Sequence, residues 1–411
     1  MIARSVLGRL ISPRVVLFFG EPFFWLLGRR GKERHTEFPR HKRVLVVRLD
    51  EIGDAVMTTP FLRELRHNLP EASITLVVKP SIRNLVELCP YVNEVLTYDR
   101  GDSRYWGPLQ GSWRALRLAY QHLWTRHFDL VVVPRWEIEL HHHSLVAYLS
   151  GAPGRVGYSQ DRVEHGGRFS RRFDPLFTHL LTDHTLKHEV ERGLEVIRFL
   201  GGVTRDDRLE LWVGEEDEFF AEEFLRSHGA RFDDTLIAVG PGAGIQRRMW
   251  PIANFVELGA WLRRSYQGRL VVLGGMGEES LGEELQRQLG DMVVNAVGRA
   301  TLRQTAALLK RCRLYVGNDA GPMHLAAAAG VPVIEISCHP PDGSPLHVNS
   351  PGRFGPWRVP HVVLRPETAR DACSEGCTSH EAHCILAITV EQVIEAVAKE
   401  VSRQTCTVLR R

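Results

Sequence analysis

Residues suited to binding a phosphate group lie in the sequence GNDAGPMHLAAAAGV, which covers positions 317–331. We predict a loop up to Gly321 and a helix with Pro322 in its first turn, where the missing N–H of proline would have no partner in any case. Unpaired N–H groups at a helix start carry partial positive charge and attract phosphate. On spacing alone, a plain strand–turn–helix connection without a ligand is the alternative.

Two adjacent arginines, Arg247 and Arg248, follow the glycine-rich sequence GPGAG at positions 240–244. Two guanidinium groups at the end of a strand suit the charge and geometry of a diphosphate. Gly242 and Gly244 have no side chains, so the backbone there can come close to a ligand. A solvated basic loop is the alternative, and the glycine run favours anion binding over it.

Three carboxylates also follow predicted strands, at the sheet edge where ligands of α/β proteins bind. Asp54 follows a strand over 44–47 and could act as a general base. A helix-capping aspartate, which stabilises by about 1 kcal/mol, is the alternative for Asp54. Glu278 and Glu279 follow GGMG at 274–277 and could accept hydrogen bonds from ribose hydroxyls, unless they only supply acidic residues to a helix start.

Five residues near the C-terminus combine thiols and imidazoles as metal sites do: Cys373, Cys377, His380, His383 and Cys384. The cysteines have the spacing C-x3-C-x6-C with no second CxxC pair, so this is not a standard zinc signature. A disulfide or plain buried thiols are the alternatives; we predict no metal and keep the cluster as a candidate. We expect the run His141–His143 at the surface, because consecutive helix residues do not share a face.

These residues lie in loops that a regular α/β framework must hold. Near-continuous apolar, β-branched runs predict strands, and they cover 44–47, 73–78, 95–98, 128–133, 236–239, 270–273, 293–294 and 331–336. Helical segments alternate with them, which predicts right-handed crossovers and parallel sheets. The pattern occurs twice, so we predict two Rossmann-like, doubly wound domains facing a central cleft. Polar segments over 160–184 and 338–385 are predicted as long loops.

Length and composition agree with a globular protein of two domains. The chain has 411 residues, of which 44% are hydrophobic and 25% charged. Its 52 basic and 49 acidic residues give a net charge of only +3, which argues against a nucleic-acid partner bound through a general basic surface. Seven cysteines, an odd number and mostly scattered, indicate a reducing compartment such as the cytoplasm.

Residues 1–42 form a basic and aromatic N-terminal extension. Its apolar run, 15–28, is too short to span a bilayer and is interrupted by Glu21 and Pro22. No small-residue cleavage site clearly follows, which argues against a signal peptide. Aromatic residues flanked by arginine and lysine are typical of a segment lying in the interface of an anionic membrane. A helix packed on the protein's own surface is the alternative.

Four segments, in this order, resemble glycosyltransferase family 9, the heptosyltransferases of lipopolysaccharide assembly. They are VLVVRLDEIGDAVMTTPFLREL over 44–65, GPGAG with RRMWP over 240–251, LGGMGEE over 273–279 and GNDAGPMHLAAAAGVPVI over 317–334. The Gly-Asp pair that ends at Asp54 is one specific part. The D-x-G-x-x-H motif of Asp319, Gly321 and His324 is the other. The resemblance covers about residues 43–400.

The resemblance implies a GT-B fold, with an acceptor domain over 43–208, a donor domain over 209–389, and a closing helix and tail over 390–411. It also implies an inverting, metal-independent glycosyltransferase that uses no cofactor. The implied donor is a nucleotide-sugar, ADP-heptose in the first place. The implied acceptor is lipopolysaccharide core or a related glycan.

Residue roles carry over from the family where the motifs match. Asp54 matches the proposed catalytic base. Arg248 matches the basic residue that steadies the leaving diphosphate, a position where the family often has lysine. Further contacts with the donor diphosphate are implied for Arg247, Gly242, Gly244, Gly321, Pro322 and Met323. Contacts with the donor nucleotide or sugar are implied for Asp319, His324, Glu278 and Glu279.

An acceptor made at a membrane would explain the N-terminal extension. We therefore expect the chain in the cytoplasm, peripheral on the inner face of a bacterial inner membrane. Two other functions fit the same residues: a nucleotide-sugar-binding protein without activity, and another GT-B enzyme such as a sugar-nucleotide epimerase. A Rossmann dehydrogenase is disfavoured, because no G-x-G-x-x-G follows the first strand.

Overall fold

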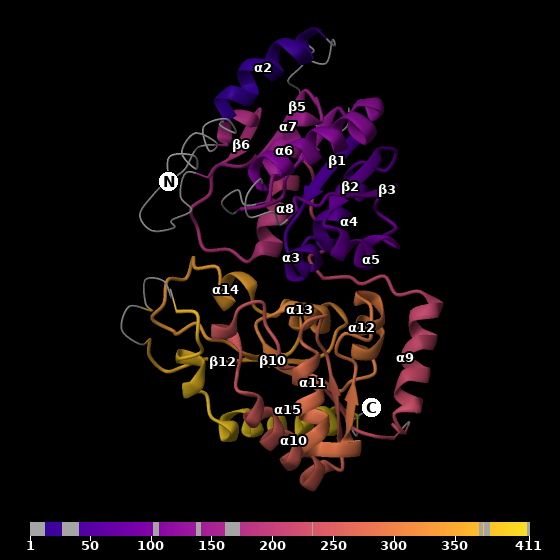
Figure 1. Cartoon of the computed structure of the whole chain (residues 1–411), viewed down its shortest axis with the longest axis vertical. Coiled ribbons are helices and arrows are strands. Elements are labelled where there is room, and N and C mark those ends of the chain that lie inside the picture. Colours follow the sequence, from indigo (N-terminus) through magenta and orange to yellow (C-terminus); the bar gives the residue numbers. More distant parts are fainter. Residues whose placement is uncertain are drawn as a thin grey trace. The chain divides into compact units, whose positions relative to one another are not determined.

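The structure is a computed structural model that describes residues 13–26, 41–101, 107–136, 141–160, 173–231, 233–369, 373 and 379–408. The chain divides into two compact units, Met1–Asp207 and Arg208–Arg411. In Figure 1 the first unit is coloured from indigo to magenta, and the second runs through orange to yellow. Each unit contains one six-stranded sheet connected by helices, which confirms the predicted α/β class.

The first unit is built on a parallel sheet with the strand order β3-β2-β1-β4-β5-β6. Its strands are β1 (Arg43–Arg48), β2 (Ser73–Val78), β3 (Glu94–Thr97), β4 (Leu130–Val132), β5 (Gly154–Tyr158) and β6 (His179–Leu181). In the middle of β1, Val46 lies opposite Leu76 on one side and Val132 on the other. The strand order reverses between β1 and β4, and doubly wound sheets bind ligands at this switch point.

Seven helices of the first unit are described: α2 (Pro13–Leu26), α3 (Ile52–Met57), α4 (Thr59–Asn68), α5 (Arg83–Val86), α6 (Gly107–Leu118), α7 (His143–Leu149) and α8 (Glu189–Phe199). Short turns are η2 (Pro80–Ile82), η3 (Ala119–Leu123), η4 (Trp124–Arg126) and η5 (Asp174–Leu176). Leu45 and Val47 of β1 are buried in one cluster with Leu118 of α6 and Val146 of α7. The burial of β1 explains why its sequence is almost continuously apolar.

The second unit repeats the same topology, with the strand order β12-β11-β10-β7-β8-β9 and all pairs parallel. Its strands are β7 (Leu236–Gly240), β8 (Arg269–Val272), β9 (Val293–Asn295), β10 (Leu314–Asn318), β11 (Val333–Ile336) and β12 (His361–Leu364). The order reverses between β7 and β10, where Ala238 lies opposite Tyr315. A second switch point therefore lies at the carboxyl ends of these two strands.

The helices of the second unit are α9 (Glu215–Ser227), α10 (Ile252–Tyr266), α11 (Glu279–Leu289), α12 (Leu302–Leu309), α13 (Gly321–Ala328), α14 (Pro351–Phe354) and α15 (Val390–Val408). Single turns are η6 (Gln246–Arg248), η7 (Gly290–Met292) and η8 (Cys384–Ala387). The closing helix α15 packs against α10, because Val393 and Val397 share a buried cluster with Phe255 and Leu258 (Figure 1).

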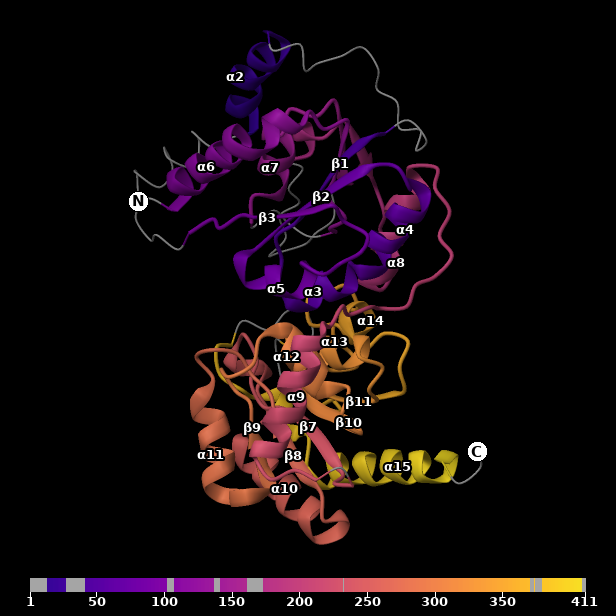
Figure 2. The same cartoon turned by 90° about the vertical axis from the view of Figure 1, so that its right-hand side faces the viewer.

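Helix α2 packs on the first unit beside α6 and α7 (Figure 2) and leaves part of its apolar surface uncovered. Phe24 is buried, with its ring centroid 5.6 Å from that of Tyr148 and 6.3 Å from that of Trp124. Phe19 and Trp25 are each 70% exposed. The helix therefore packs on the protein's own surface, which was the alternative to membrane contact in the interpretation of the extension. The basic flanks, 1–12 and 27–40, lie outside the described residues.

Helices able to cross a bilayer are absent from the part of the chain that the structure describes, since none there is both long and apolar enough. The two segments predicted as long loops contain regular structure, so that prediction is wrong in part. β6 lies within 160–184, and α14 and β12 lie within 338–385. Both strands are at sheet edges, where each has only one neighbour, and β12 is half exposed. β6 and β12 have only three and four residues and lie within long polar segments, which is why the sequence pattern missed them.

Candidate active site

A charged network lies at the carboxyl end of β1, at the switch point of the first sheet. Arg48, the last residue of β1, is buried and donates hydrogen bonds to the Pro134 backbone oxygen at 2.6 Å and to Asp54 Oδ1 at 2.8 Å. Its Nε lies 3.2 Å from Asp50 Oδ2. Arg135 donates to the other Asp50 oxygen at 2.5 Å. The ends of β1 and β4 therefore bring two arginines and two carboxylates together.

Asp54 is the third residue of α3. Glu51 is the N-cap, and its backbone N–H donates to Asp54 Oδ2 at 3.3 Å, the capping-box arrangement. Asp54 therefore takes part in capping the helix, but from the N3 position and not as the N-cap residue, because the helix already begins at Ile52. The Asp54 side chain keeps 24% of its surface exposed while Arg48 holds its other oxygen. The carboxylate is anchored and still accessible to a ligand.

The two carboxyl groups of this network differ in pKa. Burial raises the pKa of Asp54 to about 6; Arg48 opposes the shift and Asp50 adds to it. Burial also disfavours charge on Asp50, but Arg135, His143 and Arg48 more than offset it and hold the pKa of Asp50 well below its usual range. A base works best with a pKa near the operating pH. Of the two, Asp54 has the properties of a general base.

The predicted surface position of the run His141–His143 is wrong for its last member. His143 is 1% exposed, and its Nε2 lies 3.1 Å from Asp50 Oδ2 and 2.9 Å from the Leu49 backbone nitrogen. The prediction treated the three histidines as part of one helix. The helix α7 starts only at His143, and a left-handed backbone at His142 (φ 69°) redirects the chain just before it.

In the second unit, the glycine-rich loop follows β7 and lies against an acidic side chain. A Cβ atom added at Gly242 would overlap the Glu278 carboxylate, so a larger residue there would require the Glu278 side chain or the loop to move. Gly244 is exposed, and a Cβ atom on it would meet nothing within 4 Å. Gly242 is therefore closely packed against Glu278, whereas Gly244 is open to solvent.

The two candidate glutamates of the second unit have different positions. Glu278 accepts a hydrogen bond from the Gly275 N–H at 2.8 Å, in the loop after β8 and beside Gly242. Glu279 is exposed and accepts from the Gly277 N–H at 2.8 Å. The structure thus places Glu278, rather than Glu279, against the glycine-rich loop.

Asn318, the last residue of β10, joins two of the predicted ligand-binding loops. Its side chain is fully buried; Oδ1 accepts from the Trp250 backbone N–H at 3.0 Å, and Nδ2 donates to the Pro241 oxygen at 2.8 Å. Trp250 is itself buried and donates from its ring to the Ile388 oxygen at 2.8 Å. The loops after β7 are therefore fixed to the neighbouring strand at the switch point. Sequence analysis did not identify Asn318.

The two arginines of η6 have different partners. Arg247 donates to the Ser379 backbone oxygen at 3.0 Å. Arg248 donates from Nη2 to Asn349 Oδ1, and its Nη1 lies 3.5 Å from Asp319 Oδ2. The Nε atoms of both arginines are buried without a hydrogen-bond partner among the described residues. The Nε atoms of Arg48 and Arg192 are also buried without such a partner, so it is the position of Arg248 beside Asp319, near the start of α13, that makes these two arginines candidates for binding an anion.

Helix α13 begins as predicted, with Pro322 in its first turn after the extended residue Ala320. Met323 and His324 are buried. The Met323 N–H donates to the Ala320 oxygen at 3.0 Å, and Pro322 has no N–H to give. Of the three residues predicted to contact the diphosphate here, Gly321, Pro322 and Met323, Gly321 is therefore the one whose backbone N–H suits a phosphate.

Asp319, beside this helix start, is buried and shares its surroundings with a second acid, Glu335 of β11. Burial raises the pKa of Asp319, and Arg248 opposes that shift. Burial and the charge of Asp319 raise the pKa of Glu335 well above its usual range. Glu335 therefore holds its proton more tightly than an ordinary glutamate does, while Asp319 is the acid next to Arg248.

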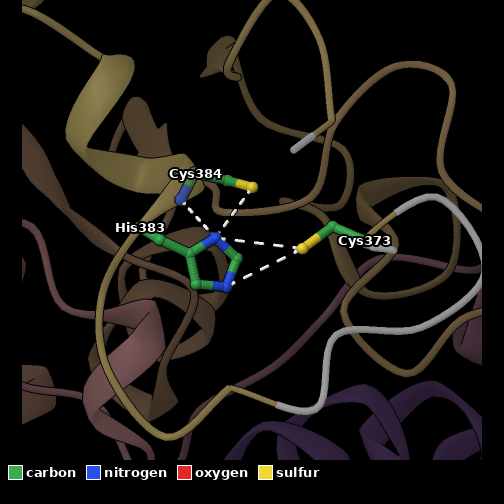
Figure 3. A group of neighbouring side chains, drawn as sticks. All are labelled: Cys373, His383 and Cys384. Carbon is green, nitrogen blue, oxygen red and sulfur yellow. Dashed lines mark hydrogen bonds between the residues drawn. The ribbon is translucent and has the colours of Figure 1, made fainter. Parts of the chain in front are cut away.

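Three of the five residues in the predicted cysteine and histidine cluster lie together (Figure 3). The ligand atoms of Cys373, His383 and Cys384 are all within 4.8 Å of one another. His380 is exposed and is not part of the group. Cys377 lies outside the described residues.

Sequence analysis missed most of the residues that hold the two sites in place. Arg48 and Asp50 belong to the segment that carries the family resemblance, so their position after β1 was available from the sequence. Arg135 and His143 are distant in sequence and reach the site only because β4 pairs with β1. Nothing in the local sequence identifies Asn349, whose loop had no predicted structure.

Two doubly wound sheets, each with polar residues gathered at its switch point, are the architecture of the GT-B glycosyltransferases. The profile described as "Glycosyltransferase family 9 (heptosyltransferase)" matches residues 120–379, and the chain belongs to this family. The chain is therefore a glycosyltransferase, which confirms the family, fold and class of enzyme predicted from the sequence.

One similar protein is lipopolysaccharide heptosyltransferase 2 of Salmonella typhimurium, which is 24% identical over 370 residues and matches 88% of this chain and 99% of its own. Among solved structures, the family 9 glycosyltransferase of Veillonella parvula superposes with a TM-score of 0.72 and 24% identity, covering 91% of this chain and 99% of its own. The E. coli heptosyltransferase WaaC with ADP gives a TM-score of 0.61 and 17% identity, covering 88% and 98%. At these identities the two structures show a shared fold.

Proposed function

We propose that this chain transfers a heptose from ADP-heptose to lipopolysaccharide core or a related glycan, with inversion and without a metal ion in the reaction. The observation that carries the proposal is the pair of adjacent arginines Arg247 and Arg248, with Arg248 Nη1 3.5 Å from Asp319 Oδ2, beside the start of α13. Positive groups in this arrangement suit a diphosphate. The E. coli heptosyltransferase WaaC was solved with ADP, which supports an ADP-linked donor.

In this proposal the second unit binds the donor. Arg247, Arg248 and the Gly321 N–H contact the diphosphate, while the close packing at Gly242 keeps the loop backbone near it. Acidic and imidazole side chains at the same strand ends make the remaining contacts with the donor. Glu278 contacts the ribose, and Asp319 and His324 contact the nucleotide or sugar.

Asp54 of the first unit acts as the base. It takes the proton from the acceptor hydroxyl while that oxygen forms a bond to the anomeric carbon of the donor. The bond from that carbon to the diphosphate breaks on the opposite side, and its electron pair stays on the leaving ADP. Arg248 and the partial charge at the start of α13 offset the added negative charge, which is why no metal is needed. Arg48 holds Asp54 in position.

We also propose that the protein works in the cytoplasm, bound to the inner face of the bacterial inner membrane through α2. Phe18, Phe19 and Trp25 are at least 70% exposed on this helix. An apolar cavity of about 590 Å³ separates α2 from α6 and is large enough to receive part of a lipid chain. Exposed aromatic side chains on a short helix suit the interface of a bilayer.

The test is an acceptor-dependent transfer assay with purified protein, ADP-heptose and lipopolysaccharide core truncated before its heptoses. We expect a glycosylated acceptor and one ADP released for each sugar transferred. Nucleotide-sugar binding without any product would overturn the proposal in favour of a binding protein. Conversion of the donor sugar in the absence of acceptor would indicate an epimerase.

A further inference from the structure

The group of Cys373, His383 and Cys384 has the geometry of a partly assembled metal site (Figure 3). His383 Nδ1 lies 3.0 Å from Cys384 Sγ and 3.9 Å from Cys373 Sγ. In a tetrahedral zinc site, ligand atoms at ordinary bond lengths are about 3.5–3.8 Å apart. The observed separations bracket these values, so small side-chain movements would place one ion at bonding distance from all three.

The imidazole is oriented to act as a ligand through one particular nitrogen. The Cys384 backbone N–H donates to His383 Nδ1 at 2.7 Å, so Nδ1 carries the lone pair of the neutral ring. Cys384 Sγ lies 3.0 Å from this nitrogen, whereas Cys373 Sγ is almost equidistant from the two ring nitrogens, at 3.9 Å from Nδ1 and 3.8 Å from Nε2 (Figure 3). A metal ion would take over the lone pair and leave the ring proton on Nε2.

The surrounding cavity offers a fourth ligand. Cys338 and His339 line the same cavity as the three residues, and its volume is about 20 Å³, room for one water-sized occupant. His339 is 5% exposed, and its Nε2 is buried without a hydrogen-bond partner among the described residues.

We propose that this cavity binds one structural transition-metal ion of the zinc class, held by Cys373, His383 and Cys384 with a fourth ligand from Cys338 or His339. Two thiolates and imidazole nitrogen are the ligands that such ions prefer, and structural sites of this kind have four protein ligands. Binding releases one proton for each thiol that becomes a thiolate, two if His339 is the fourth ligand and three if Cys338 is; nothing is oxidised or reduced.

The site would join two chain segments that contact the arginines of η6. Arg247 lines the cavity and donates to the Ser379 oxygen, in the segment that carries His383. Asn349 accepts from Arg248, and its own amide lies 3.8 Å from Cys338 Sγ. A metal ion linking these two segments would hold the arginine side chains in place without touching the donor itself.

Elemental analysis of the purified chain, with no donor or acceptor present, tests the proposal. We expect about one zinc per chain after purification under reducing conditions or after loading with zinc. Cys373→Ser and Cys384→Ser should lose the metal, whereas Cys89→Ser, a buried cysteine in the first unit, should keep it. Cobalt in place of zinc should give thiolate-to-metal absorption that the first two variants lack. Iron lost in the same variants would also support the site, because iron accepts the same ligands.

Three results would overturn the proposal: no stoichiometric metal in the wild-type chain, equal metal content in all three variants, or a Cys373–Cys384 disulfide in mass spectra of the native protein. Far-ultraviolet circular dichroism shows whether a variant that lost its metal is folded, and the cobalt spectrum of the folded wild type needs no variant at all. Because metal content is measured without substrate, failure of the transfer reaction leaves this test unaffected.

The fourth ligand is assigned by comparing Cys338→Ser with His339→Gln. One of them should weaken zinc binding by more than ~10-fold. Unchanged affinity in both would overturn the closed four-ligand site.

Discussion

Asp50 and Asp54 lie four residues apart, contact the same Arg48 and have opposite surroundings. Asp50 also faces Arg135 and His143, and its pKa lies well below the usual range. Asp54 is held by Arg48 alone among these cations, and burial raises its pKa to about 6. Two acids whose environments move their pKa values apart usually have different tasks. Here Asp50 fixes the network, and Asp54 is available to take a proton.

The rate of sugar transfer should depend on the ionisation of Asp54. With a pKa of about 6, the group is about 90% ionised at pH 7, and below pH 6 kcat/KM should fall about tenfold per pH unit. Initial rates from pH 4.5 to 8 would measure this. Asp54→Asn should abolish transfer and leave ADP binding intact. A flat profile, or a fully active variant, would contradict the assignment.

The same pKa shift has a consequence for stability. A carboxyl group whose pKa is higher in the folded state than in the unfolded chain binds its proton more tightly when folded. Its contribution to the free energy of unfolding is therefore fully present below the unfolded pKa of about 3.9 and is lost as the pH rises through about 6. Urea titrations at several pH values would measure the free energy of unfolding. In Asp54→Asn this free energy should lack the loss that the wild type shows as the pH rises through about 6.

Arg248→Gln should weaken ADP binding by about 10- to 100-fold, because charge-assisted hydrogen bonds contribute about 1.5–3 kcal/mol. Isothermal calorimetry with ADP measures the affinity. Arg264→Gln is the matched control: Arg264 lies on α10, exposed to solvent. Equal affinity for the two variants would show that Arg248 does not contact the diphosphate.

At the scale of single residues, the sequence identified groups that lie in recognisable motifs, such as Asp54 and Arg248. It could not identify Arg135 or His143, because their place in the site depends on β4 pairing with β1. The register of Leu130 with Val44 joins residues 86 positions apart in the chain. The misplacement of His143 had a local cause, the left-handed residue that precedes it.

Among the elements, the glycine-rich loop after β7 is constrained most closely. Gly242→Ala would force its new methyl group into the Glu278 carboxylate, so the loop or Glu278 must move. We expect donor affinity to fall by ~10-fold, equivalent to about 1.4 kcal/mol. Gly244→Ala keeps its N–H, meets no atom within 4 Å and should bind the donor as wild type does. Unchanged binding by Gly242→Ala would show that the loop tolerates displacement.

Helix α2 is the element through which we propose that the protein binds a membrane. Replacing Phe19 and Trp25 by serine should lower co-sedimentation with anionic lipid vesicles by more than ~10-fold, because each aromatic side chain contributes about 1.5–3 kcal/mol when buried. Phe219→Ser on α9 is the control, since this residue is also exposed, at 67%, but lies in the second unit. Wild-type protein that fails to sediment with the vesicles would rule out the proposed contact.

The elements that sequence patterns predicted best are those buried on both faces. β2 was predicted with its observed bounds, Ser73–Val78; β7 extends one residue beyond its prediction, and β8 is shifted by one residue from its prediction. Of the four edge strands, β3 and β9 were predicted, over 95–98 and 293–294, whereas β6 and β12, with three and four residues inside long polar segments, were missed. Helix α6 is followed directly by the π-helical turn η3 and the 3-10 turn η4, irregularities that apolar spacing does not reveal.

For the molecule as a whole, the two units should respond differently to the nucleotide. If ADP binds only to the second unit, ADP at ~100 times its Kd should stabilise that unit by about 2.7 kcal/mol. Scanning calorimetry, with hydrogen exchange to assign the transitions, would measure this. Protection of amides around β1 and α3 by ADP alone would place the nucleotide in the first unit and contradict the proposal.

The chain passes between its units at one position, Asp207–Arg208, and a segment without helix or strand, residues 202–214, makes the connection. On the first-unit side this segment is tied down locally: Arg63 donates to the Asp206 oxygen, and the Arg205 N–H donates to Glu64. A single crossover allows recombination to exchange a whole half of the gene without cutting a sheet. New pairings of sugar donor and acceptor could therefore arise within this lineage by shuffling halves, and a chimera joined at this position should keep the nucleotide preference of whichever parent supplied its C-terminal half.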